Sequence, residues 1–149
     1  MQKNRVIAMY KKNDLGFTLI ELMIVIVVMA IIVSIALPSY QSTVRKARRS
    51  EAKALLLEVS AAEVRYFTNR SQYTDSVTGA LPAGLGYSTD LSTGGHYRIT
   101  AAGAPNTFTL TATPQGDQAS DSICANITIT DTGVKGATGS SSNIIKDCW

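Results

Sequence analysis

The sequence predicts an α+β fold in which one long N-terminal helix packs on an antiparallel sheet of three or four strands. Two observations predict this fold. A helical pattern free of glycine and proline runs from Ser39 to about Phe67. Short alternating segments rich in β-branched residues follow between about residues 96 and 138. A helix and a sheet that are each apolar on one side bury those sides against each other.

The first half of the predicted helix is an apolar run of membrane length. From Phe17 to Leu37 it has 21 residues (17 to 37 inclusive), or about 31 Å at ~1.5 Å per residue. Its one charge is Glu21, and a carboxylate at mid-helix in hydrocarbon costs roughly 2.5–3.5 kcal/mol. A plain membrane anchor would not carry this residue. Pro38 is expected to kink the helix rather than end it, because helical sequence resumes at once.

The second half of the predicted helix is amphipathic, so its apolar face is expected to be buried against a globular domain. Apolar or small residues recur near the helical period at Ala52, Leu55, Leu56, Val59, Ala62, Val64 and Tyr66. The charges are assigned largely to the other faces, at Arg45, Lys46, Arg48, Arg49, Lys53, Glu58, Glu63 and Arg65.

The rest of the chain is predicted to form a long loop followed by strands. Residues 70–95 are rich in Ser, Thr, Gly and Tyr and predict a long connection with little regular structure. Strands are expected at 96–102, 107–113 and 123–130, and more weakly at 134–138, with turns at 103–106 and 131–133. Residues 114–121 are expected to form a looser connection, and 139–149 a serine-rich loop.

Composition limits the chain to one membrane segment and one small domain. The 149 residues carry a net charge of +3. The leader 1–16 has four basic residues and Asp14, so it supplies 4 − 1 = +3, and the remainder balances 10 basic against 10 acidic residues. The basic excess therefore serves membrane topology rather than a nucleic-acid partner. Three parts are expected: a basic leader 1–16, a transmembrane helix 17–38, and a globular domain 39–149.

The N-terminal motif resembles the prepilins of type IV pili and the related pseudopilins of type II secretion. The resemblance rests on Gly16-Phe17-Thr18-Leu19-Ile20-Glu21 after a basic leader, and on Pro38 as the twenty-second residue counted from Phe17. It implies the pilin fold, cleavage after Gly16 by a prepilin peptidase and methyltransferase, and N-methylation of Phe17. A start at Met9 instead of Met1 would give an eight-residue leader.

The resemblance also gives Glu21 a role in assembly. Cleavage leaves a free amine on Phe17, four residues before Glu21. The expectation is that Glu21 meets the N-terminal amine of a neighbouring subunit in the filament core, and that Pro38 belongs to the same assembly segment. Pairing removes most of the cost of burying either charge alone, and it favours the correct axial register.

The two cysteines, Cys124 and Cys148, are 24 positions apart (148 − 124) in the part expected to face the periplasm. That compartment is oxidising, so a disulfide is expected, with two free thiols as the alternative. No metal site is expected, because His96 is the single histidine and has no partner at ligand spacing.

DNA contact is only weakly supported at this point. The basic cluster of residues 45–49 is explained better as interfacial or solvated charge, and it lacks interleaved aromatic residues. A second candidate surface combines residues expected near the disulfide-bounded loop, namely Lys135, Lys146, His96 and Trp149.

No catalytic constellation or phosphate-binding motif is present, so the chain is interpreted as neither an enzyme nor a cofactor protein. The stretches 49–58 and 65–74 resemble minor pilins, which implies roles in pilus assembly, adhesion, twitching motility or DNA uptake. The alternatives are a major pilin, a type II secretion pseudopilin and a pilus-associated DNA receptor. The implied partners are other pilin subunits, the processing enzyme and the assembly machinery of the bacterial inner membrane. The precursor is expected in that membrane and the mature subunit in a cell-surface pilus.

Overall fold

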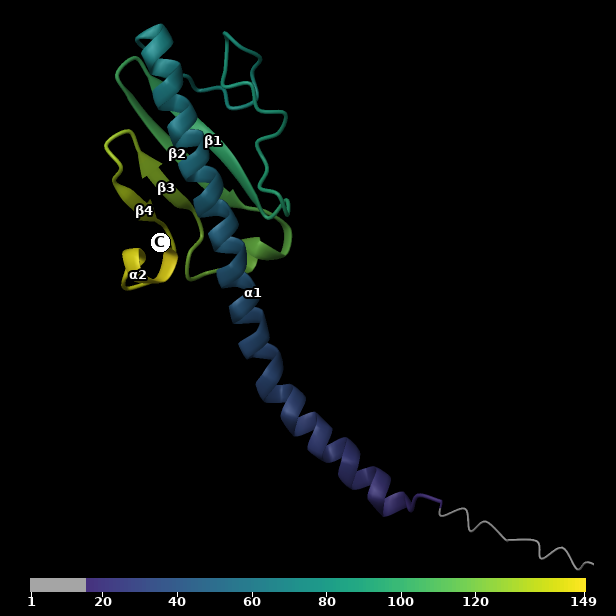
Figure 1. Ribbon diagram of the computed structural model, residues 1–149. Helices are drawn as coiled ribbons and strands as arrows, with labels where there is room; N and C mark the ends of the chain where they lie inside the picture. Colours follow the sequence, from purple (N-terminus) through teal and green to yellow (C-terminus); the bar gives the residue numbers. More distant parts are fainter. Residues whose placement is uncertain (1–15) are drawn as a thin grey trace, which may run out of the picture. The chain divides into compact units, whose positions relative to one another are not determined.

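The computed structural model describes residues 16–149, so the leader charges and both candidate start residues, Met1 and Met9, lie outside the described residues. The chain divides into two units, one ending at Ser39 and the other running from Tyr40 to Trp149. The elements in chain order are α1 (Leu19–Arg70), β1 (Tyr97–Ala104), β2 (Thr107–Pro114), η1 (Gly116–Ser120, a 3₁₀ helix), β3 (Ile127–Thr130), β4 (Lys135–Ala137) and α2 (Ile144–Cys148) (Figure 1).

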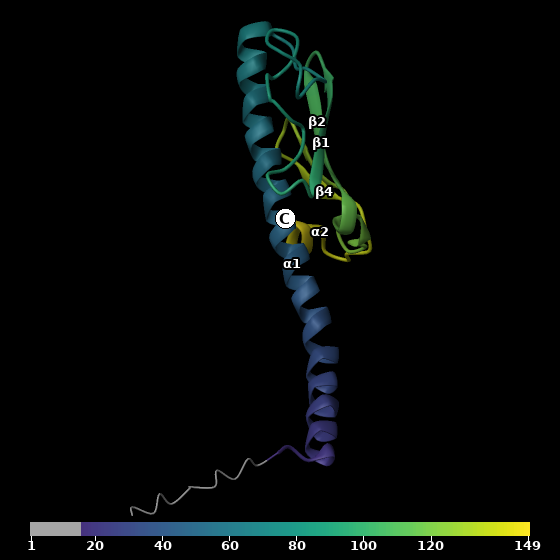
Figure 2. The same ribbon diagram turned by 90° about the vertical axis from the view of Figure 1, so that its right-hand side faces the viewer.

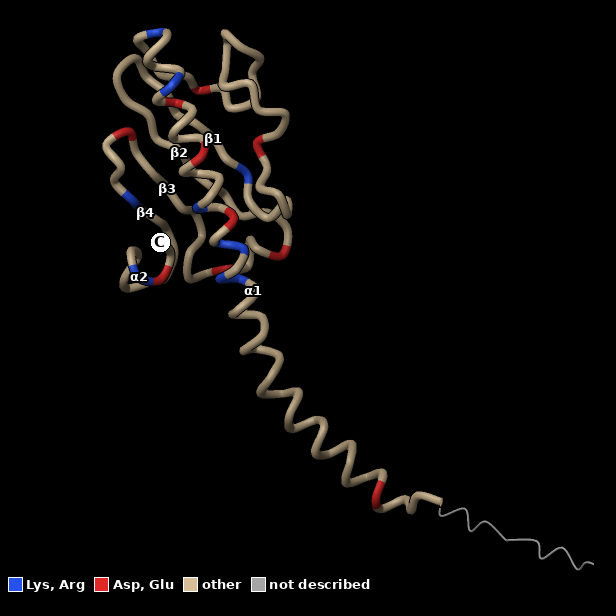
Figure 3. Tube along the Cα trace, in the orientation of Figure 1, with Lys and Arg blue, Asp and Glu red and all other residues tan. Residues whose placement is uncertain are grey.

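Helix α1 has 52 residues and continues through Pro38, as the sequence predicts. All residues from Gly16 to Tyr40 are exposed in the isolated chain. A window of 18 residues within α1 reaches a mean hydropathy of 3.0, so by length and composition the helix can cross a membrane. Glu21 is the one charged residue between Phe17 and Ser39 (Figure 3).

The four strands form one antiparallel sheet in the order β1-β2-β3-β4, in which each strand pairs with the next one along the chain. Ile99 lies opposite Ala112, and Leu110 lies opposite Ile129. The expected α+β fold of one long helix on a small antiparallel sheet is confirmed. The expected strand at 123–130 begins only at Ile127, because the Asp121 carboxylate accepts the backbone N–H groups of residues 123 and 124 and turns the chain there.

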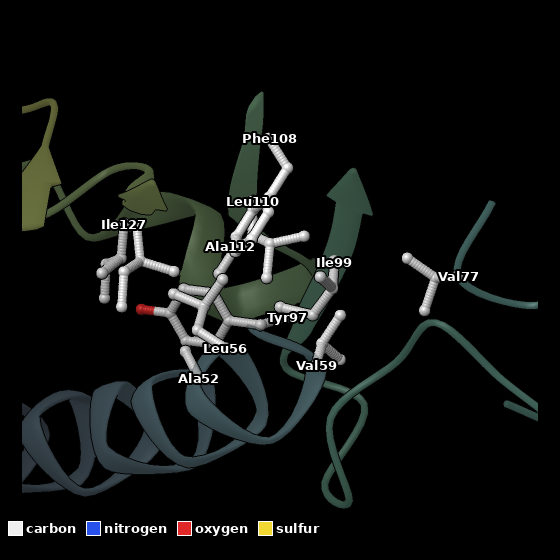
Figure 4. Close-up of a cluster of buried hydrophobic side chains, with 11 residues drawn as sticks. Ala52, Leu56, Val59, Val77, Tyr97, Ile99, Phe108, Leu110, Ala112 and Ile127 are labelled. Atoms are coloured by element: carbon white, nitrogen blue, oxygen red, sulfur yellow. The ribbon is translucent and has the colours of Figure 1, made fainter. Parts of the chain in front are cut away.

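The core lies between the sheet and the part of α1 that follows Ser39. Figures 1 and 2 show this part of α1 lying along one face of the sheet. Ala52, Leu56 and Val59 recur at helical spacing and are fully buried. They pack against alternate residues of the strands, which Figure 4 shows in close-up. These strand residues are Tyr97, Ile99, Phe108, Leu110, Ala112, Ile127 and Ile129.

Three helix positions differ from expectation. Arg49 and Glu63, expected on solvated faces, are 4% and 0% exposed, whereas Val64, expected on the buried face, is 50% exposed. Arg49 and Glu63 continue the spacing of three and four residues set by Ala52, Leu56 and Val59, so the helical period itself places them on the buried face of α1, and Val64 falls outside that face. Arg49 meets Asp121, and Glu63 meets the backbone of Thr74.

The connection between α1 and β1 is ordered by contacts with α1 and by its own backbone hydrogen bonds. The Glu63 Oε2 atom accepts the Thr74 backbone N–H at 3.2 Å. Val77 enters the core, and its carbonyl accepts the N–H of Tyr87 at 3.2 Å. The connection therefore closes over the end of α1, although it has no helix and only an isolated bridge at Leu91.

Glu63 should make the stability of the globular unit fall as the pH rises. Burial raises the pKa of the Glu63 carboxyl above its ordinary value of 4.5; the Thr74 N–H opposes this shift and the charge of Asp75 adds to it. The folded state therefore binds the proton more tightly than the unfolded state, so protonation of Glu63 stabilises the fold. This stabilisation is lost as the pH rises from 4.5 through the folded pKa. The other carboxylate oxygen of Glu63, Oε1, has no hydrogen-bond partner among residues 16–149.

The substitution Glu63→Gln should therefore raise the thermal midpoint at about pH 7.5 and flatten its pH dependence above about pH 4.5. Thermal unfolding of the full chain in neutral detergent, followed by Trp149 fluorescence, measures both effects. The exposed Glu58→Gln is the matched control on the same helix. A lower midpoint for Glu63→Gln at neutral pH, with an unchanged pH slope, would show that burial of this carboxylate does not oppose folding.

Candidate functional site

A buried ion pair joins α1 to the segment before the first cysteine. Arg49 Nε and Nη2 donate to Asp121 Oδ2 and Oδ1 at 2.6 and 2.7 Å, so the guanidinium binds the carboxylate with both of its parallel donors. Both side chains are almost fully buried. In addition, Arg49 Nη1 donates to the backbone carbonyl of Asp147 in α2 at 3.1 Å. One side chain of α1 therefore contacts two separate segments of the C-terminal region.

The Asp121 carboxylate is surrounded by donors. Burial alone would raise the pKa of this carboxyl, but the Arg49 hydrogen bonds and charge, with the N–H groups of Cys124 and Ile123, hold the pKa below its ordinary value of 3.8. Gln118 Nε2 bridges Asp121 Oδ2 at 3.1 Å and the Tyr97 hydroxyl at 3.0 Å. The network therefore connects α1, η1 and the start of β1 around an ionised carboxylate.

The C-terminal region is closed by the expected disulfide between Cys124 and Cys148, both of which are buried. Helix α2 precedes Cys148, and the Asn143 side chain caps it by accepting the Lys146 N–H. The neighbouring Trp149 donates its Nε1 hydrogen to the Gly136 carbonyl in β4 at 2.8 Å, and its own carbonyl accepts from Lys53 Nζ at 3.0 Å. The end of the described chain is thus joined to both the sheet and α1.

The candidate DNA surface is only partly assembled. Lys135 Nζ lies 5.0 Å from the centre of the Trp149 ring, a cation–π contact. Lys146 is exposed in α2, which lies beside β4. His96 does not join them, because it directly precedes β1, the strand at the opposite edge of the sheet from β4. Of the four residues expected together, Lys135 and Trp149 are in contact, Lys146 lies in the helix beside β4, and His96 lies apart.

A hollow, here called the basic groove, lies between α1 and α2. Its volume is about 560 Å³. Five basic residues line it, with one acidic residue, Asp147. Figure 3 shows basic positions gathered in the turns of α1 beyond Ser39. The lining residues are Ser42, Arg45, Lys46, Arg49, Ser50, Lys53, Ile123, Lys146 and Asp147.

The face of α1 that points away from the sheet carries a second pattern. Small or apolar residues alternate at spacings of three and four, and all are exposed. Leu57 and Val64 are each 50% exposed in this stripe. Such spacing suits packing against another helix, and small residues allow close approach. The members of this outer stripe are Ala47, Ser50, Ala54, Leu57, Ala61 and Val64.

The start of α1 shows how Glu21 is positioned. Helix α1 begins at Leu19, so Thr18 is the N-cap residue, and its Oγ1 accepts the Glu21 N–H at 3.3 Å. Thr18 and Glu21 have the spacing of a capping box, a signal that the sequence analysis did not use. A carboxylate in the first turn also interacts favourably with the helix dipole. Phe17, which directly precedes Thr18, is 85% exposed.

Two family models match this chain. Residues 38–128, more than half of the chain, match the family described as "Type IV minor pilin ComP, DNA uptake sequence receptor". Residues 11–37 match the family described as "Prokaryotic N-terminal methylation motif". The first match covers most of the globular unit, and the second covers the apolar run with the residues just before it.

Similar curated proteins are pilins. A fimbrial protein of Neisseria meningitidis serogroup A is 41% identical over 76 residues, which cover 51% of this chain and 43% of that protein. The type IV major pilin protein PilA of Myxococcus xanthus is 29% identical over 96 residues, covering 64% of this chain and 41% of PilA. The chain thus spans about two fifths of the length of these relatives.

A solved structure with a similar fold is that of the non-core minor pilin PilV of Neisseria meningitidis. The TM-score is 0.50 at 21% identity, and the match covers 68% of this chain and 94% of that chain. This likeness concerns the fold: a long helix packed on a four-stranded antiparallel sheet.

The substitution Asp121→Asn should destabilise the globular unit strongly, because it leaves the buried Arg49 cation without its counter-ion. The expected loss is about 3–5 kcal/mol in the free energy of unfolding. The control Asp90→Asn removes the exposed pair with Arg98 and should cost at most about 1 kcal/mol. Urea titration of the full chain in neutral detergent measures both changes.

Because the folded pKa of Asp121 is lowered, the stabilisation by the pair is present above pH 3.8 and is lost as the pH falls through the folded value. Equal losses for Asp121→Asn and Asp90→Asn would show that burial gives the Arg49 pair no special importance.

Proposed function

The chain belongs to the type IV pilin family, and on that premise we propose that it is a minor subunit of a type IV pilus. The observation that carries the proposal is the match of residues 38–128 to a minor-pilin family, because those residues form most of the globular unit. The N-terminal motif is shared by major and minor pilins alike and does not distinguish them. The outer stripe of α1 supports assembly, since it offers a small-residue helix face that the globular unit leaves uncovered.

Processing forms part of the proposal. The precursor is held in the inner membrane by residues 17–37, cut after Gly16 and methylated on Phe17 by a prepilin peptidase and methyltransferase. The match to the methylation motif over residues 11–37 supports this order of events. The mature subunit then enters the filament through the assembly machinery and becomes part of the cell-surface pilus. There it supports assembly, adhesion, twitching motility or DNA uptake.

Glu21 and Pro38 are proposed to act in assembly. Thr18 fixes the first turn of α1, so the Glu21 carboxylate projects from a defined helix start one turn from the Phe17 amine. In a filament core, the carboxylate pairs with the amine of a neighbouring subunit, because an unpaired charge is costly in apolar surroundings. Pro38 ends the run 17–38 and lies inside α1 at the boundary to the globular unit.

A second candidate function is that of a DNA receptor on the pilus. The specific observation that favours it is the description of the matched family as a DNA uptake sequence receptor. Lys135 and Trp149 support it, since they offer a cation for a DNA phosphate beside an amphipathic ring, and Lys146 adds a second exposed cation.

The minor-subunit proposal is tested by quantifying this chain in sheared pili by mass spectrometry. The chain should be present but scarce relative to the most abundant pilin of the same filaments. Deletion of its gene should reduce piliation or a pilus function, and a plasmid copy should restore it. If the chain is instead the most abundant subunit, it is a major pilin; if deletion abolishes secretion of type II substrates and leaves pili intact, it is a pseudopilin.

The substitution Glu21→Gln should block entry into pili, because it removes the charge and keeps the length and hydrogen-bonding capacity of the side chain. The variant should remain membrane-bound with a methylated Phe17, as mass spectrometry of the mature N-terminus would show. The control Thr18→Ala removes the cap oxygen and keeps the carboxylate, so it should still be incorporated. Normal incorporation of Glu21→Gln would contradict the proposed pairing.

The DNA-receptor proposal predicts salt-dependent binding of duplex DNA by the full chain in neutral detergent. Lys135→Gln should weaken binding and reduce the slope of log affinity against log salt by about 1, as for the loss of one phosphate contact. The control is Arg70→Gln, an exposed cation at the end of α1. Absence of DNA binding by the unsubstituted chain, or equal losses in both variants, would count against this second function.

A further inference from the structure

The basic groove between α1 and α2 has a charge that its own residues do not neutralise. Five cations and one carboxylate, Asp147, line it, and one of the five, Arg49, is neutralised by the buried Asp121. The Asp147 Oδ2 atom already accepts the hydroxyl hydrogen of Ser141 at 2.8 Å. A hollow with such an excess of positive charge attracts an anion from solution.

The cations of the groove fall into two groups. Three of them have partners within the chain: Arg49 binds Asp121, Lys53 binds the Trp149 carbonyl, and Arg45 donates to the Ser120 hydroxyl. The other two, Lys46 and Lys146, form no side-chain hydrogen bond or ion pair within residues 16–149 and are exposed. They come from α1 and α2, 100 positions apart (146 − 46), and both line the same hollow. Two unpaired ammonium groups beside one cavity suit a phosphate group.

The position of the groove along α1 favours a lipid phosphate. Lys46 is nine residues after Leu37 (46 − 37), or about 14 Å of helix at ~1.5 Å per residue. The headgroup zone extends about 5–8 Å beyond the hydrocarbon core on each side, so the Lys46 backbone lies above this zone and its flexible stem reaches down to the outer headgroups. Ile123, which is 47% exposed and also lines the groove, adds an apolar contact beside the cations.

We propose that the basic groove binds the phosphate headgroup of an anionic phospholipid while the subunit is held in the membrane. Lys46 and Lys146 contact the phosphate oxygens from the two sides of the groove. A hollow of about 560 Å³ suits one headgroup, whereas a DNA duplex requires a long open surface. The inference rests on the membrane-held precursor of the proposed function and is independent of the minor-subunit and DNA-receptor roles.

The test is native mass spectrometry of the full chain released from neutral detergent micelles that contain phosphatidylglycerol or phosphatidylcholine. The unsubstituted chain should retain phosphatidylglycerol in preference to phosphatidylcholine. Lys46→Gln and Lys146→Gln should each weaken that retention about fivefold. Arg70→Gln is the matched control, because Arg70 is also exposed on α1 but lies at its far end. Circular dichroism confirms that the variants fold.

Equal retention of the two lipids, or equal losses in Lys46→Gln and Arg70→Gln, would overturn the inference. It would also be overturned if Lys46→Gln weakened binding of duplex DNA and left phosphatidylglycerol retention unchanged, because the groove would then belong to DNA. Flotation of the full chain with pure phosphatidylcholine vesicles separates the two levels of the proposal. If the chain floats but shows no preference for phosphatidylglycerol, lipid binding by the groove is refuted and membrane attachment is not. If the chain does not float, membrane attachment of the precursor is refuted as well.

Discussion

The Arg49–Asp121 ion pair is the interaction on which the arrangement of the globular unit depends. It is buried, doubly hydrogen-bonded and extended by Gln118 and Tyr97 into a network without water-exposed members. Leaving either charge alone in this place would be costly, so the two segments that supply them are constrained to meet. Through the Asp147 carbonyl, the same guanidinium also fixes α2. Both surfaces considered for ligands, the basic groove and the Lys135–Trp149 contact, lie in the region that this network positions.

Helix α1 is apolar in its first half and amphipathic in its second, and the buried face of the second half includes two charged residues. The buried face of α1 contains Arg49 and Glu63 among its small and aliphatic residues. Arg49 is neutralised by a carboxylate, whereas Glu63, within the described part of the chain, has a single backbone donor and one oxygen without a partner. One buried charge therefore stabilises the domain, and the other makes it sensitive to pH.

Much of the fold follows from the sequence because periodic patterns report which face of an element is buried. The long helix and the hairpin of β1 and β2 were predictable in this way, and the disulfide was predictable because the sequence has two cysteines in a part expected to face an oxidising compartment. The pattern could not predict η1 and α2, which are short and depend on the tertiary contacts of Asp121 and the capping by Asn143. It also could not show that His96 and Lys135 lie at opposite edges of the sheet, since strand order is a long-range property. The N-terminal motif was the most informative functional signal in the sequence. The basic groove could not be predicted from the sequence, because its residues Lys46 and Lys146 are 100 positions apart (146 − 46) and meet only in the folded chain.

The joining of Trp149 to Lys53 and of Cys148 to Cys124 has a mechanical consequence for a filament subunit. When a filament is pulled, the load on each subunit runs along α1 and must pass into the sheet. The cross-linked C-terminal segment contacts α1 at Arg49 and Lys53 and reaches β4 through the Trp149 indole. It thus gives the load a route to the far edge strand that does not rely on the apolar core alone. The sheet is braced against shearing off its helix at the end where the globular unit begins.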